Sequence, residues 1–281
     1  PRISALTLYP VKSMRGIDVE TATLTPLGLR HDRQFMVVRG NGRFVTQRDA
    51  PGLALIETSL MDDGVILSRS GHGTVHVPFR HDGARLIRTR VWKDECEALD
   101  QGDAVSDWLT DALQSKEPLR LVAMAPGFDR PQGKAELLGA NNRTLFADAA
   151  PFLVASEASL ERLNDELAGD GIDPVPMNRF RPNIVLRGLP AFAEHTKASL
   201  AGKGFALRLH YPCQRCIVTT IDQATAVKSP LNEPYRTLVR INPMPNRETS
   251  PAFGQNATLA HGDGCAVRRG DSLSIEDSDI E

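Results

Sequence analysis

The chain has 281 residues, of which 41% are hydrophobic and 24% charged, and its formal net charge is −2. This composition predicts a soluble globular protein with room for two domains, and it lacks the overall positive charge of most nucleic-acid-binding proteins. No apolar run approaches the roughly 20 residues that a membrane-spanning helix needs, and the N-terminal segment lacks the apolar core of a secretory signal. We therefore expect a cytoplasmic protein that binds no nucleic acid and does not span a membrane.

The first part of the chain is predicted to consist of short strands separated by turn residues. The first strand candidate alternates between apolar and polar side chains, and Gly40-Asn41-Gly42 joins two later candidates as a hairpin turn would. Such closely spaced strands favour a barrel or a sandwich. One amphipathic helix is expected at residues 104–113, followed by an apolar strand at 119–123. The strand candidates before this helix are residues 3–9, 34–39, 43–47, 54–60, 65–68, 74–79 and 86–92.

Residues 126–143 are rich in Gly, Pro, Gln and Asn and show no hydrophobic period, so they are predicted to form a linker or mobile loop. This linker would separate an N-terminal domain, residues 1–125, from a C-terminal domain, residues 144–281. The second domain is predicted to be mainly β as well, apart from a capped amphipathic helix that begins after Ser156. A helical turn is expected within 230–240 and a loop at 244–253. Its strand candidates are residues 152–155, 183–186, 206–209, 216–221, 257–259, 266–268 and 272–275.

Basic and polar side chains gather at the ends of several predicted strands, where loops commonly carry function. Guanidinium groups and backbone amides suit phosphate, so these side chains together predict an anion-binding pocket. For any one cluster alone, the alternative is that its arginines are ordinary solvated surface residues. The clusters are Lys12-Ser13 with Arg15, residues 30–33, residues 46–48, residues 178–183, and Arg215.

Two cysteines flank Arg215 in the segment YPCQRCIVTT, residues 211–220. A zinc site needs further ligands at matched spacing, and the one later cysteine is Cys265, so zinc is weakly supported. A thioredoxin-like redox motif opens a helix, whereas the residues after Cys216 are strand-forming. Two interpretations stay open. Cys213 and Cys216 pack as small hydrophobic residues, or one is a thiolate ligand, favoured by the nearby arginine, for a metal that an organic, phosphate-bearing sulfur cofactor holds.

Several motifs occur in an order that covers nearly the whole chain. In the first half they are LYPVKSMRG, HDRQFMVV and FVTQRDAP, and in the second half FADAAPFLVASEASLERLN, NRFRPNIVL, PCQRCIVTTID and FGQN. By these motifs the chain resembles the MOSC (molybdenum cofactor sulfurase C-terminal) superfamily, in the branch of the bacterial YcbX proteins and the mitochondrial amidoxime reducing component. The resemblance implies a mainly β (α+β) fold of two β-barrel-like domains with a few peripheral helices and a cofactor cleft between them.

The resemblance also implies a molybdenum cofactor, with the metal bound by a molybdopterin dithiolene and one protein cysteine. Carried over to this chain, the metal ligand is Cys216, whereas Cys213 has no assigned role. Asp148 matches an acidic position near the metal, where its catalytic role would be to relay protons or orient a ligand. Gln214 stands where many members have serine, and DAAPF where many have DASPF. The side chains implied to hold the pterin and its phosphate are Lys12, Ser13, Arg33, Arg181, Asn183 and Arg215.

The activity that the resemblance implies is reduction of small N-hydroxylated compounds, such as amidoximes and hydroxylamines, by oxygen removal at molybdenum. No cysteine follows Cys265 to bind a fused cluster. The electrons would therefore come from a separate donor, a [2Fe–2S] ferredoxin-type protein or a flavin reductase protein, or else a fused ferredoxin domain has been removed from the chain. Two alternatives stay open. One is a carrier of molybdenum cofactor or sulfur without its own turnover, and the other is a β-barrel interaction module that binds no metal.

Overall fold

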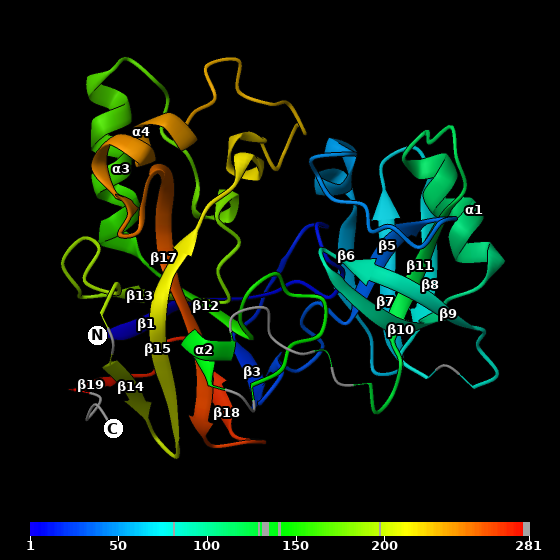
Figure 1. The fold of residues 1–281 in the computed structure, drawn as a ribbon, viewed down its shortest axis with the longest axis horizontal. Coiled ribbons are helices and arrows are strands. Elements are labelled where there is room, and N and C mark those ends of the chain that lie inside the picture. The colour runs from blue at the N-terminus through cyan, green and yellow to red at the C-terminus, as the bar shows by residue number, and fades with distance from the viewer. Residues whose placement is uncertain (81, 129, 131–134, 140–141, 197, 278–281) are drawn as a thin grey trace.

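Strands outnumber helices along the chain, and the helices lie on the outside of two sheet-containing lobes (Figure 1). The computed structural model describes all residues except 81, 129, 131–134, 140–141, 197 and 278–281. The prediction of a mainly β fold with a few peripheral helices is confirmed. Each helix in the described residues is too short or too polar to cross a membrane. The helices are α1 Asp103–Ala112, α2 Ala135–Leu138, α3 Glu157–Gly169 and α4 Tyr235–Ile241.

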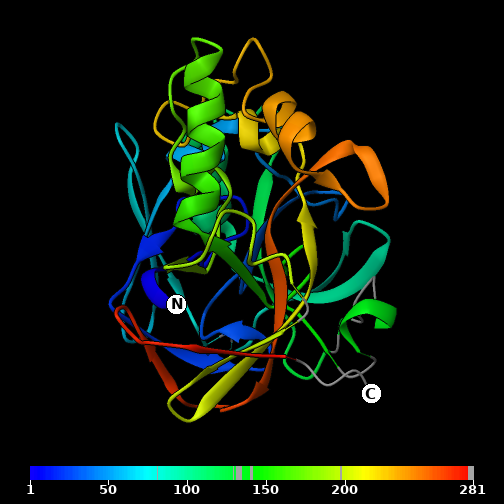
Figure 2. The same ribbon diagram turned by 90° about the vertical axis from the view of Figure 1, so that its left-hand side faces the viewer.

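The largest sheet holds nine strands and draws on both ends of the chain. Strand β1 pairs antiparallel with β13, with Leu6 opposite Ile184, and β13 pairs in parallel with β12. Fully buried Phe152 and Leu207 belong to its core. Helices α3 and α4 lie together at one end of this sheet (Figure 2). In spatial order the strands are β19 Ser274–Asp277, β14 Ala198–Gly202, β15 Phe205–Gln214, β17 Arg247–His261, β12 Phe152–Ser156, β13 Ile184–Arg187, β1 Arg2–Leu8 and β2 Ile17–Asp18, with β16 Pro243–Met244 paired to β17.

The second lobe is built from smaller sheets and α1. The helix packs on β11 through Val105 and Leu109, so the predicted helix at 104–113 and the strand at 119–123 are confirmed. A further small sheet, β18-β3-β4, belongs to the first lobe, where Leu24 and Val267 pack in the core of the nine-stranded sheet, and it joins segments from the two ends of the chain (Figure 1). The strands of the second lobe are β5 Phe35–Arg39, β11 Leu119–Met124, β10 Asp94–Asp100 and β9 Leu86–Val91 in one sheet, and β6 Glu57–Leu60, β7 Gly64–Arg69 and β8 Gly73–Pro78 in another. Those of the further sheet are β18 Ala266–Arg268, β3 Thr21–Thr25 and β4 Gly28–Leu29.

The sheets do not follow the predicted division at residues 126–143. Strand β1 lies in the nine-stranded sheet, and β3 pairs with β18 from the other end of the chain. A division into residues 1–125 and 144–281 therefore describes the order of the chain rather than the grouping of its strands. Within 126–143, α2 forms one helical turn, and the prediction of a linker falls partly on residues 129, 131–134 and 140–141, which lie outside the described residues.

The predictions for residues 244–253 and 43–47 are wrong. Residues 244–253, expected to be loop from their composition, are mostly strand, because β17 begins at Arg247 and pairs with β15 and β16. Pairing with neighbouring strands overrides local composition here. Residues 43–47 make isolated bridges rather than a strand, because Asp49 accepts a hydrogen bond from Thr46 N–H at 3.1 Å and turns the chain.

The place of β1 in the larger core gives a prediction about stability. Leu6 is 1% exposed, so Leu6→Ala should lower the free energy of unfolding by about 2–5 kcal/mol through lost burial and a residual cavity. Leu86→Ala, at a side chain that is 54% exposed, should change it by no more than about 0.5 kcal/mol. Urea unfolding measures both variants, and equal midpoints would show that β1 does not contribute to this core.

Candidate functional site

Loops from both halves of the chain meet at a cavity of about 200 Å³. The chain passes from β1 to Lys12 and Ser13 at this cavity, and β15 ends at Gln214 beside it, so two strands of the nine-stranded sheet lead to the cavity walls. The lining includes every residue that the resemblance assigned to a site, although these residues are far apart in the sequence. They are Lys12, Ser13, Arg33, Asp148, Arg181, Asn183, Arg215 and Cys216.

Cys216 immediately precedes a 3-10 helix, Ile217–Thr220, where the sequence predicted a strand. That prediction is wrong because the threonine hydroxyls bond within the turn. Thr219 Oγ1 donates to Cys216 O at 3.1 Å, and Thr220 Oγ1 donates to Ile217 O at 2.7 Å. Local hydrogen bonds of this kind compete with strand pairing. Cys216 is exposed at the cavity, so its thiol is accessible to a ligand.

Arg215 is anchored beside the other cysteine. Its Nη1 donates to Cys213 Sγ at 3.0 Å, and its Nη2 donates to Phe180 O at 2.8 Å. Its Nε is buried and has no hydrogen-bond partner among the described residues. The guanidinium therefore contacts Cys213 rather than Cys216, and its Nε–H is a donor that a further group at the cavity could satisfy.

Two guanidinium groups lie over the ring of one buried tyrosine. The Cζ atoms of Arg33 and Arg181 are 4.2 and 4.3 Å from the centre of the Tyr9 ring. Arg33 also donates to Asp32 at 2.5 Å and to Arg181 O at 3.1 Å. Contact with the ring stabilises each guanidinium, but the two like charges repel each other at this short range. Arg181 Nη2 is buried without a hydrogen-bond partner among the described residues, so the pair is suited to binding an anion.

Burial shifts the pKa values of Arg181 and Tyr9, but Arg181 stays protonated. Burial lowers the pKa of Arg181 to about 10, and Arg33 adds to this effect, so the side chain is cationic near neutral pH. Burial raises the pKa of Tyr9 to about 12, so its hydroxyl keeps its proton. An anion placed against the guanidinium pair would reduce the repulsion between them. Tyr9 is a site residue that the sequence analysis missed.

The backbone is left-handed at Ser13, Arg33 and Arg181, where φ is +69°, +46° and +56°. Residues other than glycine rarely adopt this conformation, which costs roughly 1 kcal/mol or more at each position. Neighbouring hydrogen bonds hold it, since Arg33 N–H donates to Tyr9 O at 2.7 Å. Strained backbone of this kind concentrates at functional sites. Left-handed backbone occurs at three residues that the sequence motifs assigned to the site, and this supports placing the functional site at the cavity that they line.

Lys12 and Asp148 form an ion pair at the cavity wall. Lys12 Nζ donates to Asp148 Oδ1 at 2.6 Å and to Phe146 O at 2.8 Å, and Trp92 Nε1 donates to the same carboxylate oxygen at 2.9 Å. Burial alone would raise the pKa of Asp148, but the Lys12 ammonium and the Trp92 N–H outweigh it and hold that pKa well below its usual range. Asp148 is therefore an anion near neutral pH. Trp92, expected only as the end of a strand, is a second residue that the sequence analysis missed.

Two buried glutamines link the segments on either side of the cavity. Gln47 Nε2 donates to Gln223 Oε1 at 2.9 Å, and Gln223 Nε2 donates back to Gln47 Oε1 at 3.0 Å. The remaining N–H groups bond to backbone, from Gln47 to Ser13 O at 2.7 Å and from Gln223 to Ile221 O at 2.9 Å. The pair therefore connects the strained loop at Ser13 to the turn that follows Cys216.

The Asn183 side chain forms hydrogen bonds to two strands of the nine-stranded sheet. Its Oδ1 accepts a hydrogen bond from Leu153 N–H at 3.2 Å, and its Nδ2 donates to Thr7 O at 3.3 Å. The side chain is buried, and it ties β12 to β1 at the back of the cavity. These contacts give Asn183 a positioning role for the cavity wall.

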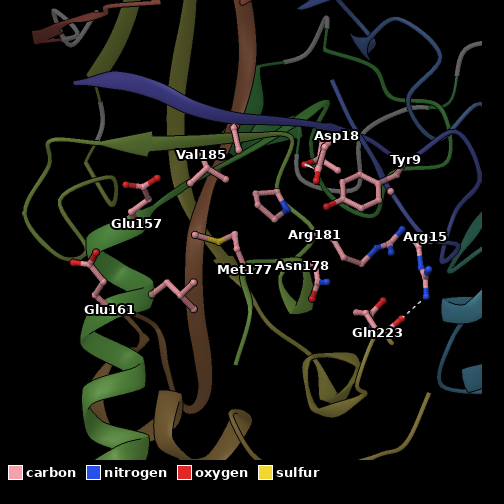
Figure 3. Close-up of a pocket in the computed structure, with 15 residues that line it drawn as sticks. Tyr9, Arg15, Asp18, Glu157, Glu161, Met177, Asn178, Arg181, Val185 and Gln223 are labelled. Carbon is pink, nitrogen blue, oxygen red and sulfur yellow. Dashed lines mark hydrogen bonds between the residues drawn. The ribbon is translucent and has the colours of Figure 1, made fainter. Parts of the chain in front are cut away.

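A neighbouring cavity of about 530 Å³ shares Arg181 with the first (Figure 3). Glu157 and Glu161 of α3 line one end, and at the other end Arg15 donates to Gln223 O at 3.3 Å. Arg181 is the one arginine that lines both cavities, so its position links them.

The donor groups at the first cavity fit a phosphate-bearing cofactor with a sulfur-binding metal. Cys216 offers one exposed thiol, and Arg181 Nη2 and Arg215 Nε are buried donors that phosphate oxygens would satisfy. Within the described residues, no group of three or more His, Cys, Asp or Glu side chains is placed to hold a metal ion. Cys216 would supply a single protein ligand, and the other ligands of a metal bound there would belong to its cofactor.

Comparison with known proteins matches both halves of the chain. Residues 1–116 match the MOSC N-terminal beta barrel domain, and residues 141–274 match the MOSC domain. The chain is 35% identical over 269 residues to mitochondrial amidoxime-reducing component 1 of Homo sapiens, with 92% of this chain and 78% of that protein covered. It is 33% identical over 244 residues to mitochondrial amidoxime reducing component 2 of Bos taurus, with 84% and 70% covered.

The Lys12–Asp148 pair predicts a dependence of stability on pH. The pKa of Asp148 is lower in the folded protein than its ordinary value of 3.8, so the pair stabilises the fold above about pH 5 and this stabilisation is lost as the pH falls below about 4. Asp148→Asn should lower the free energy of unfolding at neutral pH and reduce its decline between about pH 5 and pH 3. Urea unfolding at each pH measures both effects. Asp173→Asn, at an exposed carboxylate, is the control, and identical pH profiles for wild type and Asp148→Asn would contradict the prediction.

The glutamine pair predicts coupled effects on stability. Gln223→Leu leaves buried amide groups of Gln47 unsatisfied, so it should lower the free energy of unfolding by about 1–3 kcal/mol. Gln47→Leu should do the same, and the double variant should lose less than the sum of the single changes. Urea unfolding of the three variants completes a double-mutant cycle. Additivity within about 0.5 kcal/mol would show that the two side chains do not interact.

Proposed function

The chain belongs to the family of proteins that join a MOSC N-terminal β-barrel domain to a MOSC domain, and from this we propose a molybdenum-cofactor-dependent reductase of N-hydroxylated compounds. The observation that carries the proposal is one cavity that combines an exposed Cys216 thiol with the unpartnered guanidinium donors of Arg181 and Arg215. The names of these relatives refer to amidoxime reduction, and amidoximes are the substrates we propose to test first.

The overall reaction is reductive removal of oxygen from nitrogen. The N–O bond of an amidoxime breaks, an N–H bond forms, and the oxygen leaves as water, with consumption of two electrons and two protons. The molybdenum cofactor, when bound, would supply a sulfur-ligated centre for this two-electron chemistry. The protein would hold that cofactor, orient the substrate and control the local charge.

Each proposed residue role follows from its contacts. Cys216 would be the protein ligand of the metal, because its thiol is exposed at the cavity. Arg33 and Arg181 would hold the anionic end of the cofactor, since their charges are concentrated over Tyr9. Arg215 would donate its Nε–H to the same end of the cofactor, and the hydrogen bond to Cys213 Sγ would hold the Arg215 side chain in position.

Asp148 is suited to orientation rather than to proton transfer. A carboxylate that an ammonium and an indole N–H keep ionised is a weak base near neutral pH, and it has no proton to donate. The exposed part of Asp148 would instead present a fixed negative charge to the substrate, and Lys12 would hold that charge in place. Protons would then reach the substrate from solvent at the open side of the cavity.

The electron donor and the cellular location stay proposals. A separate [2Fe–2S] ferredoxin-type or flavin reductase protein would deliver the electrons. The names of the relatives refer to mitochondria, whereas the proposal of a cytoplasmic location for this chain rests on its sequence composition.

The second candidate function is a carrier that holds molybdenum cofactor or sulfur on Cys216 and performs no turnover. Its supporting observation is the same exposed thiol. A reductase oxidises a reduced viologen in proportion to added benzamidoxime, whereas a carrier passes its cofactor to an apo-enzyme and oxidises no donor.

Cys216→Ala tests the proposed metal ligand. We expect this variant to lose bound molybdenum and benzamidoxime reduction together, because Cys216 would be the only protein ligand. Elemental analysis and the oxidation of reduced viologen measure the two properties.

Cys265→Ala is the matched control. It removes a thiol that donates to Gly204 O at 3.3 Å and is not part of the cavity lining, so molybdenum content should stay close to that of the wild type. Full molybdenum content and turnover in Cys216→Ala would show that the ligand assignment is wrong.

A further inference from the structure

An arginine-rich hollow of about 760 Å³ lies next to the proposed cofactor cavity. Thr46 and Arg48 line both spaces, so the two lie on either side of these residues. Part of the hollow belongs to the edge strand β9, in the lobe opposite α3 (Figure 1). We call the side chains of Arg43, Arg48, Arg88 and Arg90, together with Trp92, the arginine face.

The arginine face carries an excess of positive charge. Its four arginines outnumber the two carboxylates of the hollow, Glu95, which pairs with Arg90 at 3.1 Å, and Asp49, which accepts hydrogen bonds from Thr46. Arg43 and Arg88 are exposed and form no ion pair within 4 Å among the described residues, and Glu97 lies opposite Arg88 on the neighbouring strand β10. These two cations are therefore available to a negatively charged partner.

An exposed aromatic side chain lies within these charges. Trp92 is 47% exposed, and its backbone is left-handed with φ of +56°. The indole is held in place on several sides, because Arg48 Cζ lies 4.6 Å from a ring centre and Phe44 makes an edge contact at 5.1 Å. Its N–H donates a hydrogen bond to Asp148, which lines the proposed cofactor cavity. Tryptophan and arginine are the side chains most enriched at the centres of protein interfaces.

We propose that the arginine face docks an acidic [2Fe–2S] protein that delivers electrons to the cavity. This inference rests on the proposed reductase function, which consumes two electrons for each N–O bond broken. A [2Fe–2S] cluster passes one electron at a time, so two donor encounters serve each turnover and the complex must separate quickly. Small interfaces steered by rim charges have this property. The arginine face provides such charges around one aromatic anchor, beside the place where the electrons are used.

The test uses the full chain and a plant-type [2Fe–2S] ferredoxin, which is an acidic protein, as the probe. The variant is Arg43→Glu/Arg88→Glu, which reverses the two unpaired charges and leaves Arg48 and Trp92 intact. The matched control is Arg236→Glu/Arg247→Glu, at exposed arginines in the lobe of α3 and α4. Calorimetric titration at about 20 and 200 mM salt measures ferredoxin binding, and reduction of benzamidoxime is measured with ferredoxin and, separately, with reduced viologen.

We expect wild type and control to bind ferredoxin at low salt and to lose affinity at high salt. The Arg43→Glu/Arg88→Glu variant should bind about tenfold more weakly and show a correspondingly higher KM for ferredoxin. Its viologen-driven rate should equal that of the wild type, because the small donor does not need the arginine face.

Equal ferredoxin affinity in the variant and the control would overturn the docking proposal, and so would wild-type binding that is absent at low salt or insensitive to salt. A parallel loss of the viologen-driven rate in the variant would overturn it too, since the arginines would then act on the cavity. Failure of the wild type to reduce benzamidoxime with viologen would count against the proposed function, while the binding titration would still decide the docking surface.

Discussion

The two guanidinium groups over the Tyr9 ring are the constraint on which the rest of the site depends. The Cζ atoms of Arg33 and Arg181 lie 4.2 and 4.3 Å from the centre of that ring. Because like charges repel at such short range, other contacts must stabilise the two guanidinium groups in this arrangement. Contact with the Tyr9 ring offsets part of the repulsion between the two guanidinium groups, and the Asp32 carboxylate neutralises the charge of Arg33. The remaining positive charge, with an Nη2 on Arg181 that has no hydrogen-bond partner among the described residues, makes the cavity suited to binding an anion.

The fold maintains this arrangement by joining chain segments that are far apart. Strand β1 lies in the same sheet as β13, which places Tyr9 close to the segment that contains Arg181. Asn183 fastens β1 to β12, and the paired glutamines connect the Ser13 loop to the turn after Cys216. The left-handed backbone at Ser13, Arg33 and Arg181 is the conformational cost of this geometry. The site is therefore a property of the interlocked lobes rather than of either half of the chain.

Sequence motifs predicted which residues gather at the cavity, but not how they are connected. The strand alternation and the helix at 104–113 were predictable because their periods are strong. Strand β10 was missed because four of its seven residues are Asp or Glu, which are depleted in strands, and the turn after Cys216 was mistaken for a strand because threonine favours both. Tyr9 and Trp92 gave no signal in the sequence, since their roles depend on partners more than 20 and 50 residues away. Contacts of that kind are set by tertiary structure.

A crystal structure of the cofactor-loaded protein, with anomalous diffraction at the molybdenum edge, tests most directly whether this cavity holds the cofactor. We predict the metal at bonding distance from Cys216 Sγ and the cofactor phosphate within hydrogen-bond distance of Arg181 Nη2. A metal bound away from Cys216, or a phosphate held outside the cavity between the two lobes, would contradict the proposed site.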